Sequence, residues 1–449
     1  MKSSSSDRRS GIPNLNLNQS SASSPAIAAR AGSARPSIPS RPAASRPSAE
    51  PRTPAVDARR PPEALARPGA SDRPTVPGGG RRHYAAIEGL RAIAAGAILL
   101  HHFLLAHPLS TALLPYTHHL EFGVPVFFVI SGFVLYRPWV GVGLATIDAG
   151  ALLRYGRRRV ARIVPAFWVA LTLAAAGGLS EGRTGAHPLT YYGFLQVYSI
   201  HTAFNGLGVA WSLGTELTFY AVLPLLAIGA IRIGGKRSLA VAAILVIATL
   251  GVRYLSFSEN LPALAFTLAG TLDWFVIGMG LATVAVRRPQ WIARVNPAGA
   301  LAAGVGLLLA MGALRLPWGV IAYNANPTAG GSITAHLFYG AIGLMFVLAA
   351  TSAEQRRSGI VPRLLRNRAA IWLGTVSYGI YLWHVPVIGA VTSIVGRGWL
   401  PSNAGVQLVA VALGTTLVAS LSWVLLERPI VRSRLVRGAR VPSPATAPA

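Results

Sequence analysis

The stretch of sequence that decides the fold is residues 87–103, which read IEGLRAIAAGAILLHHF. It opens the first long apolar run of the chain, and yet it contains Glu88, Arg91 and a pair of histidines. An ionisable group in membrane hydrocarbon costs roughly 2.5–3.5 kcal/mol on insertion scales, so such groups are rare and usually functional. This run therefore predicts a membrane helix with a functional role.

The spacing within this run places two of its ionisable residues together. Arg91 and His102 are separated by close to three full helical turns, so they share one helix face, roughly 16 Å apart along the axis. His101 points about 80° away from that face. The pattern indicates a polar path across a membrane.

Composition supports a membrane protein. Hydrophobic residues make up 52% of the 449 residues and charged residues only 12%, where a soluble domain carries about twice that charged fraction. Apolar runs of about 20 residues recur after residue 84, so the predicted fold class is an all-α polytopic membrane protein. The absence of cysteine excludes disulfides, cysteine-ligated metals and a cysteine nucleophile.

The net charge of +27 raises the question of a nucleic-acid partner. The basic residues lie mainly in the N-terminal tail and in loops between apolar runs, which is the pattern of membrane topology. We therefore expect the lipid bilayer, and no nucleic acid, as the surrounding partner.

The chain is predicted to have three parts. Residues 1–82 are rich in Ser, Pro, Ala and Arg and are expected to form a disordered cytoplasmic tail. Residues 83–432 form the transmembrane domain, and 433–449 form a short disordered tail.

About ten membrane spans are predicted, and the basic residues of their loops set the orientation. The positively charged loops fall on the same side as both termini, which are therefore predicted to be cytoplasmic. The aromatic segment 180–208 is expected at the outer interface, since it is short for a span. The predicted spans are about 84–106, 119–136, 163–179, 209–230, 238–256, 262–285, 297–314, 333–350, 370–395 and 405–426.

Two motifs have both a structural and a functional interpretation. The second span contains Ser131-Gly132, which is typical of a site where helix backbones approach closely. The basic cluster before the third span includes Arg158, Arg159 and Arg162, with Pro165 suited to a first helical turn. The cluster either marks the cytoplasmic side or holds a phosphorylated donor, because guanidinium groups match phosphate geometry.

Two further motifs bring polar residues into the outer half. The fourth span opens with Trp211 and Ser212 and then carries Glu216, a buried carboxylate that either pairs with a cation or is protonated. His102, at about the same depth, is its expected partner. In the ninth span, Ser377, Tyr381 and His384 form a polar stripe on one helix face. Glu216 and His384 are read either as structural groups or as parts of a site, and Asp273 in the sixth span is expected to be structural. No metal-binding spacing, phosphate-cradling glycine loop or serine nucleophile elbow is present.

Taken in order, these motifs resemble the acyltransferase-3 family of bacterial membrane O-acyltransferases, from about Tyr84 to Arg432. The family opening Leu-Asp-Gly-Leu-Arg-Gly is matched by residues 87–92, with Glu88 for Asp and Ala92 for Gly. The other family motifs and their matches are Arg/Lys-x10-His at Arg91 and His102, Phe-Phe-x-x-Ser-Gly-Phe at 127–133, Arg-x-x-Arg at Arg159 and Arg162, Trp-Ser-Leu-x-x-Glu at 211–216 and Ser-Tyr-x-x-Tyr-Leu-x-His at 377–384.

The resemblance implies a multi-pass enzyme of the cell (inner, cytoplasmic) membrane that transfers an acyl group from cytoplasmic acyl-CoA to a sugar or glycosylated hydroxyl. Acetyl-CoA is the expected co-substrate, with no permanently bound cofactor and no metal. His102 would be the general base, Glu216 would orient it, and Arg91 would line the donor path. Direct transfer and an acyl-histidine intermediate are both open. The residues assigned to binding are Arg158, Arg159 and Arg162 for CoA, and Ser131, Trp211, Ser212, Tyr381 and His384 for the acceptor side.

Two other functions compete with this one. A transporter or flippase would use the intramembrane His, Glu and Arg side chains as a substrate or proton path. An inverted repeat would support that class, and the sequence shows none. A membrane scaffold would leave the aligned ionisable residues unexplained.

Overall fold

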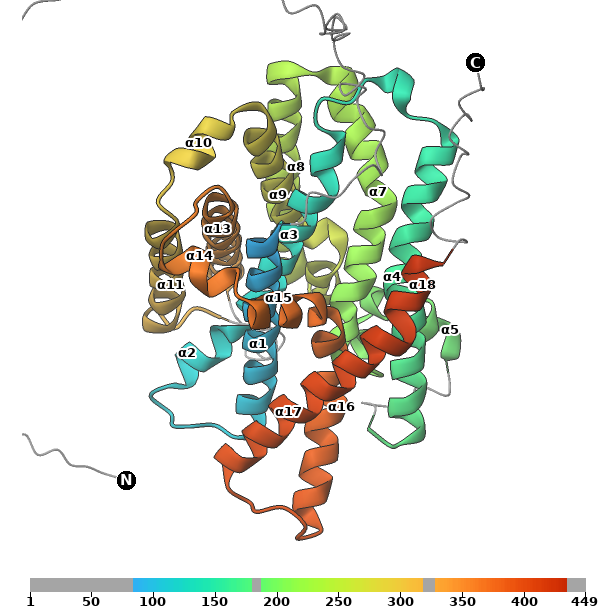
Figure 1. Cartoon of the computed structure of the whole chain (residues 1–449), viewed down its shortest axis with the longest axis vertical. Helices are drawn as coiled ribbons and strands as arrows, with labels where there is room; N and C mark the ends of the chain where they lie inside the picture. The colour runs from blue at the N-terminus through green and yellow to red at the C-terminus, as the bar shows by residue number, and fades with distance from the viewer. Residues whose placement is uncertain (1–83, 180–186, 318–327, 434–449) are drawn as a thin grey trace, which may run out of the picture. The chain divides into compact units, whose positions relative to one another are not determined.

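The computed structural model describes residues 84–179, 187–317 and 328–433, and these form helices with no strand among them (Figure 1). Both predicted tails lie outside the described residues, apart from Ser433. The long helices are α1 (Ala85–Ala106), α3 (Gly123–Tyr136), α4 (Ala149–Ala176), α7 (Trp211–Ile233), α8 (Gly235–Ser258), α9 (Leu272–Arg287), α11 (Pro297–Ala313), α13 (Ala329–Glu354), α16 (Ser377–Gly396) and α17 (Ala404–Ser422). The shorter ones are α2 (Leu114–His118), α5 (Pro188–Tyr192), α6 (Ile200–Ala203), α10 (Pro289–Arg294), α14 (Ile360–Leu365), α15 (Arg368–Thr375) and α18 (Arg428–Arg432).

The all-α polytopic prediction is confirmed. Within the described ranges, eight stretches are long and apolar enough to cross a membrane. They are Ala85–Ala106, Leu114–Trp139, Ala149–Ala176, Gly208–Ile233, Gly235–Ser258, Ala329–Glu354, Ser377–Gly396 and Ala404–Arg432. The other two expected spans correspond to α9 and α11, which are helices of only 16 and 17 residues.

The shortness of α9 has a local cause. The first half of the expected span 262–285 forms two 3-10 turns, Pro262–Phe266 and Leu268–Gly270. Carbonyl groups released from regular helix need another donor inside a membrane. Arg253 of α8 supplies it, since its guanidinium donates to the carbonyl oxygens of Ala265 at 3.1 Å and Gly270 at 3.4 Å.

The third span begins earlier than expected. Asp148 caps α4 by accepting a hydrogen bond from the backbone N–H of Ala151, and the helix then continues without a break to Ala176. The arginine cluster is therefore helical, and Pro165 lies inside the helix, so its prediction as a first-turn residue is wrong. The described part of the segment 180–208 contains only short helices, which agrees with its expected place at the interface.

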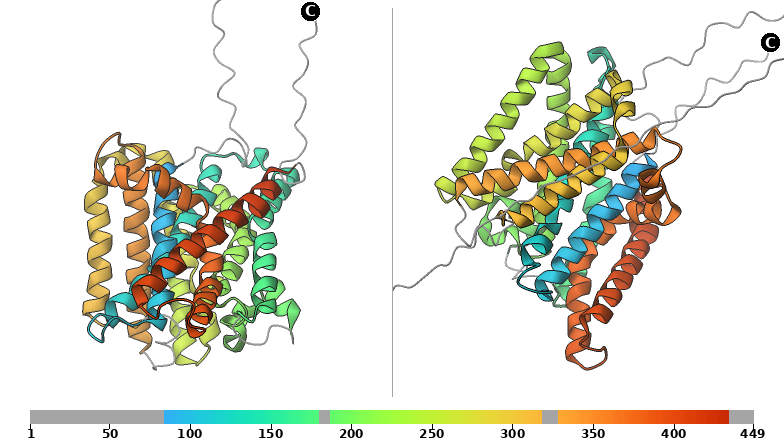
Figure 2. Two further views of the ribbon diagram at one scale, coloured as in Figure 1. Left: turned by 60° about the horizontal axis from the view of Figure 1, so that its bottom comes forward. Right: turned by 90° about the vertical axis from the view of Figure 1, so that its left-hand side faces the viewer.

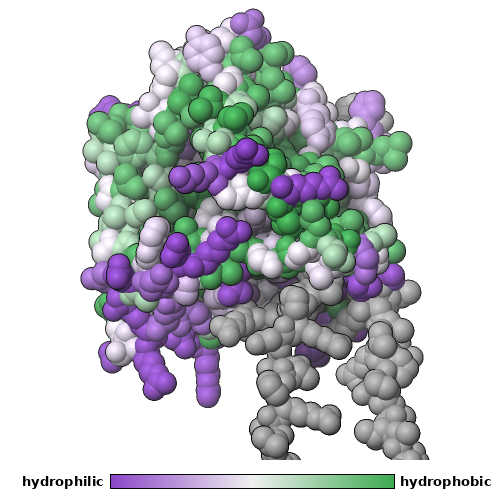
Figure 3. Space-filling view, turned by 90° about the horizontal axis from the view of Figure 1, so that it is seen from above, coloured by the Kyte–Doolittle hydropathy of each residue, from purple (hydrophilic) through white to green (hydrophobic). Residues whose placement is uncertain are grey.

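The ends of the described chain lie on one side of the bundle. In the left panel of Figure 2, the start of α1 and the end of α18 are at the same end of the near-parallel helices. Figure 3 shows apolar side chains over much of the visible surface, with a large group of hydrophilic side chains at the lower left and others across the middle and around the rim. This arrangement fits termini on one side of a membrane; the cytoplasmic side remains a prediction.

The bundle places α3 at its centre, packed along α9 and α13, while α1 packs on α15 and α16. Two glycines set the approach of α3 to α9. A Cβ on Gly132 would overlap the Phe275 carbonyl oxygen, and one on Gly278 would overlap that of Val129. The structural interpretation of Gly132 as a close-packing position is therefore correct. The side chain of its neighbour Ser131 instead donates a hydrogen bond to Glu216.

Candidate active site

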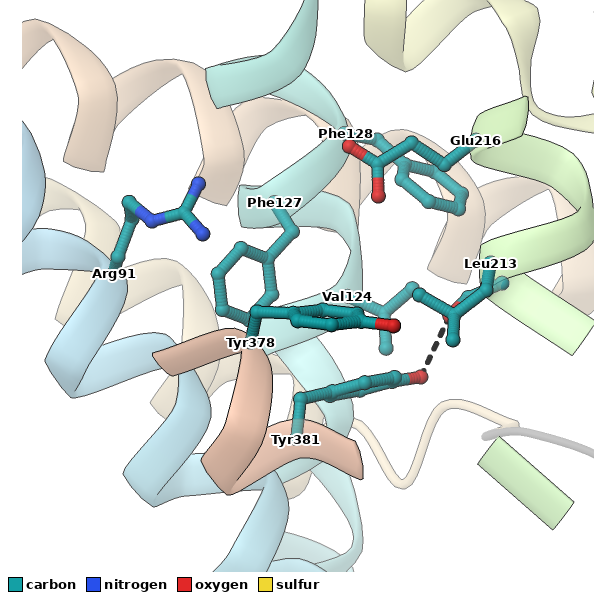
Figure 4. A pocket seen from close by; sticks show the side chains of 9 residues that line it. Arg91, Val124, Phe127, Phe128, Leu213, Glu216, Tyr378 and Tyr381 are labelled. Carbon is teal, nitrogen blue, oxygen red and sulfur yellow. Dashed lines mark hydrogen bonds between the residues drawn. The ribbon is translucent and has the colours of Figure 1, made fainter. Parts of the chain in front are cut away.

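A pocket of about 400 Å³ opens between four helices at the centre of the bundle (Figure 4). Its walls come from α1, α3, α7 and α16. The lining residues are Arg91, Val124, Phe127, Phe128, Ser212, Leu213, Glu216, Tyr378 and Tyr381.

Arg91 reaches into this pocket from α1. Its Nε donates to Ser377 Oγ at 3.2 Å and lies 3.6 Å from Glu88 Oε2. The guanidinium carbon lies 5.5 Å from the centre of the Phe127 ring. These contacts fix a cation at the pocket wall, and Figure 4 shows its terminal nitrogens directed into the space between the helices.

Glu216 faces Arg91 from the opposite wall of the pocket (Figure 4). One carboxylate oxygen, Oε1, accepts hydrogen bonds from Ser131 Oγ and from Tyr220 OH, both at 2.6 Å. Charge-assisted bonds of this length hold a carboxylate firmly. The expected partner of Glu216 was His102; among the described residues the hydrogen bonds of Glu216 come from Ser131 and Tyr220 instead.

His102 pairs with a histidine of α16. Its Nδ1 lies 3.2 Å from Nε2 of His384 and 3.0 Å from the carbonyl oxygen of Ile98. Arg91 and His102 both meet α16, so the shared helix face expected from their spacing exists. His101 turns its ring at right angles to that of His102, with 5.0 Å between the ring centres.

The histidine pair adjoins the pocket through Tyr381. This side chain lines the pocket, and its ring centre lies 5.9 Å from that of His384. The Tyr381 hydroxyl lies 2.7 Å from Ser212 Oγ and donates to the Val209 carbonyl at 2.9 Å. Tyr381 thus contacts both the pocket and the histidine pair.

The arginine cluster of α4 connects to the same pocket. The Arg159 guanidinium lies over the rings of Tyr155 and Tyr220, at 5.6 and 5.9 Å, and Tyr220 in turn donates to Glu216. Arg159 Nε is buried without a hydrogen-bond partner. Over the described ranges, neither Arg159 nor Arg162 has a carboxylate within 4 Å, although Arg162 is in electrostatic range of Arg91. These two cations therefore have no carboxylate within 4 Å in the described ranges, although Glu427 is in electrostatic range of Arg162.

Comparison with known proteins identifies the chain. A family model described as an acyltransferase domain (Acyl_transf_3) matches residues 84–426. The chain belongs to this acyltransferase family. As a member, it is a multi-pass membrane acyltransferase.

Curated relatives of this acyltransferase cover most of the membrane part. Nodulation protein 10 of Rhizobium leguminosarum is 28% identical over 70% of this chain and 82% of its own length. The exopolysaccharide production protein ExoZ of Rhizobium meliloti is 27% identical over 70% of this chain and 92% of its own. Acyltransferase MdmB of Streptomyces mycarofaciens is 27% identical over 80% and 95% of the two chains. No solved structure matches the acyltransferase.

The predicted acceptor-side residues separate into four groups in the acyltransferase. Ser212 and Tyr381 line the pocket, Ser131 binds Glu216, and His384 binds His102. Trp211 packs against the rings of Phe128 and Phe266, with centres 6.3 and 5.2 Å away, so Phe128 rather than Trp211 lines the pocket. Arg158 is half-buried on α4 next to Arg159.

Some residues of the site were not predicted. Tyr220 shares the helix face of Glu216 at i, i+4, a spacing that signals the contact. Phe127 and Tyr378 line the pocket from inside motifs already recognised, and the Tyr378 hydroxyl donates to the Ile163 carbonyl of α4 at 2.8 Å.

A second polar pair lies outside the pocket. His336 Nε2 lies 2.8 and 2.9 Å from the two carboxylate oxygens of Asp273, and both side chains are buried. Trp274 stacks on the His336 ring and donates to the His336 carbonyl at 3.2 Å. This packing fits the expected structural role of Asp273. In the described part of the chain, no group of three His, Asp or Glu side chains could hold a metal ion.

Proposed function

We propose that this acyltransferase moves an acyl group, acetyl in the first place, from cytoplasmic acyl-CoA to a hydroxyl of a sugar or glycosylated acceptor. The observation that carries the proposal is the pair Arg159 and Arg162, which have no carboxylate within 4 Å in the described ranges; Arg159 leads through Tyr220 to a pocket adjoining a histidine pair. The names of two relatives support a glycan acceptor, since they refer to exopolysaccharide production for ExoZ and to peptidoglycan O-acetylation for OatA of Listeria monocytogenes.

The donor would bind by its phosphates. Guanidinium groups bind phosphate oxygens in a bidentate manner. On α4, Arg159 Nε has no hydrogen-bond partner, and neither Arg159 nor Arg162 has a carboxylate within 4 Å among the described residues. The pantetheine arm and thioester would extend into the pocket between Arg91 and Tyr378. In this position Arg91 can donate hydrogen bonds to the thioester carbonyl oxygen, where negative charge develops in the transition state.

The transfer itself needs one base. The acceptor hydroxyl oxygen attacks the thioester carbonyl carbon, a C–O bond forms and the C–S bond breaks. The hydroxyl proton passes to His102 and from there to the CoA sulfur, so the reaction consumes and releases no proton overall. His102 is the accessible member of the histidine pair, because it is half-buried whereas His384 is fully buried.

The role that we infer for Glu216 differs from the expected one, which was to orient His102. Its bonds to Ser131 and Tyr220 hold α3 and α7 together at the pocket, and its charge faces Arg91. We infer that Glu216 keeps the Arg91 guanidinium directed into the pocket and holds Tyr220 under Arg159.

The test uses membrane vesicles from cells that express the full chain. With acetyl-CoA labelled in the acetyl group, label should enter alkali-labile esters of the glycan fraction together with stoichiometric thiol release. Uptake of labelled sugar into the vesicles with no thiol release would refute acyl transfer and support the transporter interpretation. Thiol release without labelled glycan ester would refute the proposed acceptor class.

A further inference from the structure

The two histidines between α1 and α16 belong to one chain of hydrogen bonds. His384 Nδ1 lies 2.8 Å from the carbonyl oxygen of Tyr381 and 3.2 Å from that of Ile380. On the other side of the ring, His384 Nε2 lies 3.2 Å from His102 Nδ1. His384 is completely buried, so these contacts account for its polar atoms.

These contacts determine which ring nitrogens of His384 and His102 carry a hydrogen. A carbonyl oxygen only accepts, so Nδ1 of His384 must carry a hydrogen. A neutral imidazole has a single N–H, which leaves Nε2 of His384 as an acceptor. His102 Nδ1 must then be the donor, shared between His384 Nε2 and the Ile98 carbonyl at 3.0 Å. The lone pair of His102 is therefore on Nε2, the nitrogen that points away from both partners.

We propose that His384 is a positioning residue: it holds His102 in the tautomer and orientation that present Nε2 as the base. This inference rests on the proposed function of His102. When a partner binds one ring nitrogen of a histidine, that hydrogen bond sets which of the two nitrogens carries the hydrogen and which is free to accept a proton. When His102 takes a proton on Nε2, its Nδ1–H bond to His384 becomes charge-assisted and stronger.

A neutral hydrogen-bond partner for His102, such as His384, suits a position inside a membrane-spanning segment. A carboxylate behind His102 would leave an anion in a membrane-spanning segment during the resting state, at a high cost in free energy. Among the described residues, two other titratable rings lie against the pair: His101, whose ring centre lies 5.0 Å from that of His102, and Tyr381, whose ring centre lies 5.9 Å from that of His384. The acid at similar depth, Glu216, is held by Ser131 and Tyr220.

The alternative is that His384 only fills space in the helix contact. Substitutions separate the two roles. His384→Gln places an amide oxygen near the position of Nε2 and keeps the acceptor, whereas His384→Leu removes it. Losing a hydrogen bond to a group that becomes charged is expected to lower kcat about 10- to 100-fold in the Leu variant. The Gln variant should stay within about threefold of wild type, and the KM for acetyl-CoA should not change in either.

A double-variant comparison gives the decisive readout. Because His384 acts through His102, His384→Leu should cause no further loss of residual transfer in a His102→Gln background. Equal losses in both backgrounds, or a Gln variant as slow as the Leu variant, would overturn the positioning role. If His384→Leu lowers the melting temperature, His384→Asn replaces it, since its amide is too short to reach His102.

The two proposals fail in different ways. Full turnover in His102→Gln would overturn the assignment of the base. An inactive His102→Gln beside a fully active, folded His384→Leu would leave the base in place and overturn only the inference about His384.

Discussion

The contact between α3 and α9 makes a sharp prediction for Gly132→Ala. The added Cβ would overlap the carbonyl oxygen of Phe275 and lie 2.9 Å from its carbonyl carbon. Because both obstacles are backbone atoms, the two helices must move apart by about 1 Å to restore van der Waals contact. Overpacking of this kind costs about 1–3 kcal/mol, so we expect a clearly lower melting temperature.

The same displacement should reach the pocket. Phe128 lines the pocket while its ring stacks on Phe275 with centres 4.5 Å apart, and Ser131 binds Glu216 from the residue next to Gly132. A shift of about 1 Å at groups that position a substrate can cost up to about 100-fold in rate. Turnover of Gly132→Ala should therefore fall at least tenfold even at temperatures where the variant is folded.

The assay combines thermal unfolding in detergent, followed by circular dichroism, with thiol release from acetyl-CoA. The matched control is Gly96→Ala on α1, since Gly96 is exposed and a Cβ there meets nothing within 4 Å. The control should match wild type in both measurements. If Gly132→Ala also melts and turns over like wild type, the described approach of α3 to α9 is wrong.

Three further predictions follow from the site and its surroundings. Arg162→Gln should raise the KM for acetyl-CoA about tenfold and leave the KM for acetyl-pantetheine, which lacks phosphates, unchanged; equal effects on both donors would contradict phosphate binding by Arg162. Ser131→Ala removes one of the two donors to Glu216 and should lower kcat severalfold with no change in melting temperature, as steady-state kinetics would show. Asp273→Ala leaves the buried His336 without its partner and should reduce stability by about 1–2 kcal/mol in a chemical unfolding experiment, while the folded fraction keeps its turnover.

Hydropathy and loop charge predicted the helical membrane domain well, because each long span must be apolar over its length. They failed where side chains replace helical hydrogen bonds. Nothing in residues 262–271 alone shows that Arg253, from the preceding helix, binds the carbonyls freed there. The early start of α4 was also missed, since its first turns are too basic to look like part of a span.

Motif spacing predicted contacts along one helix better than contacts between helices. The spacing of Arg91 and His102 correctly gave a shared face, which meets α16. The pairing of Glu216 with His102 was inferred from similar depth alone, but depth does not say which helices are neighbours. In the structure α7 presents Glu216 to Ser131 of α3, while α1 presents His102 to α16.

The most direct test of the central claim compares two neighbouring histidines in one assay. His102→Gln and His101→Gln, purified from the full chain, would be mixed with acetyl-CoA in glycan-containing membranes, and glycan ester would be measured. Ester formation is expected to fall at least about 1,000-fold in His102→Gln and to stay within severalfold of wild type in His101→Gln. Retained ester formation in a folded His102→Gln variant would contradict the account.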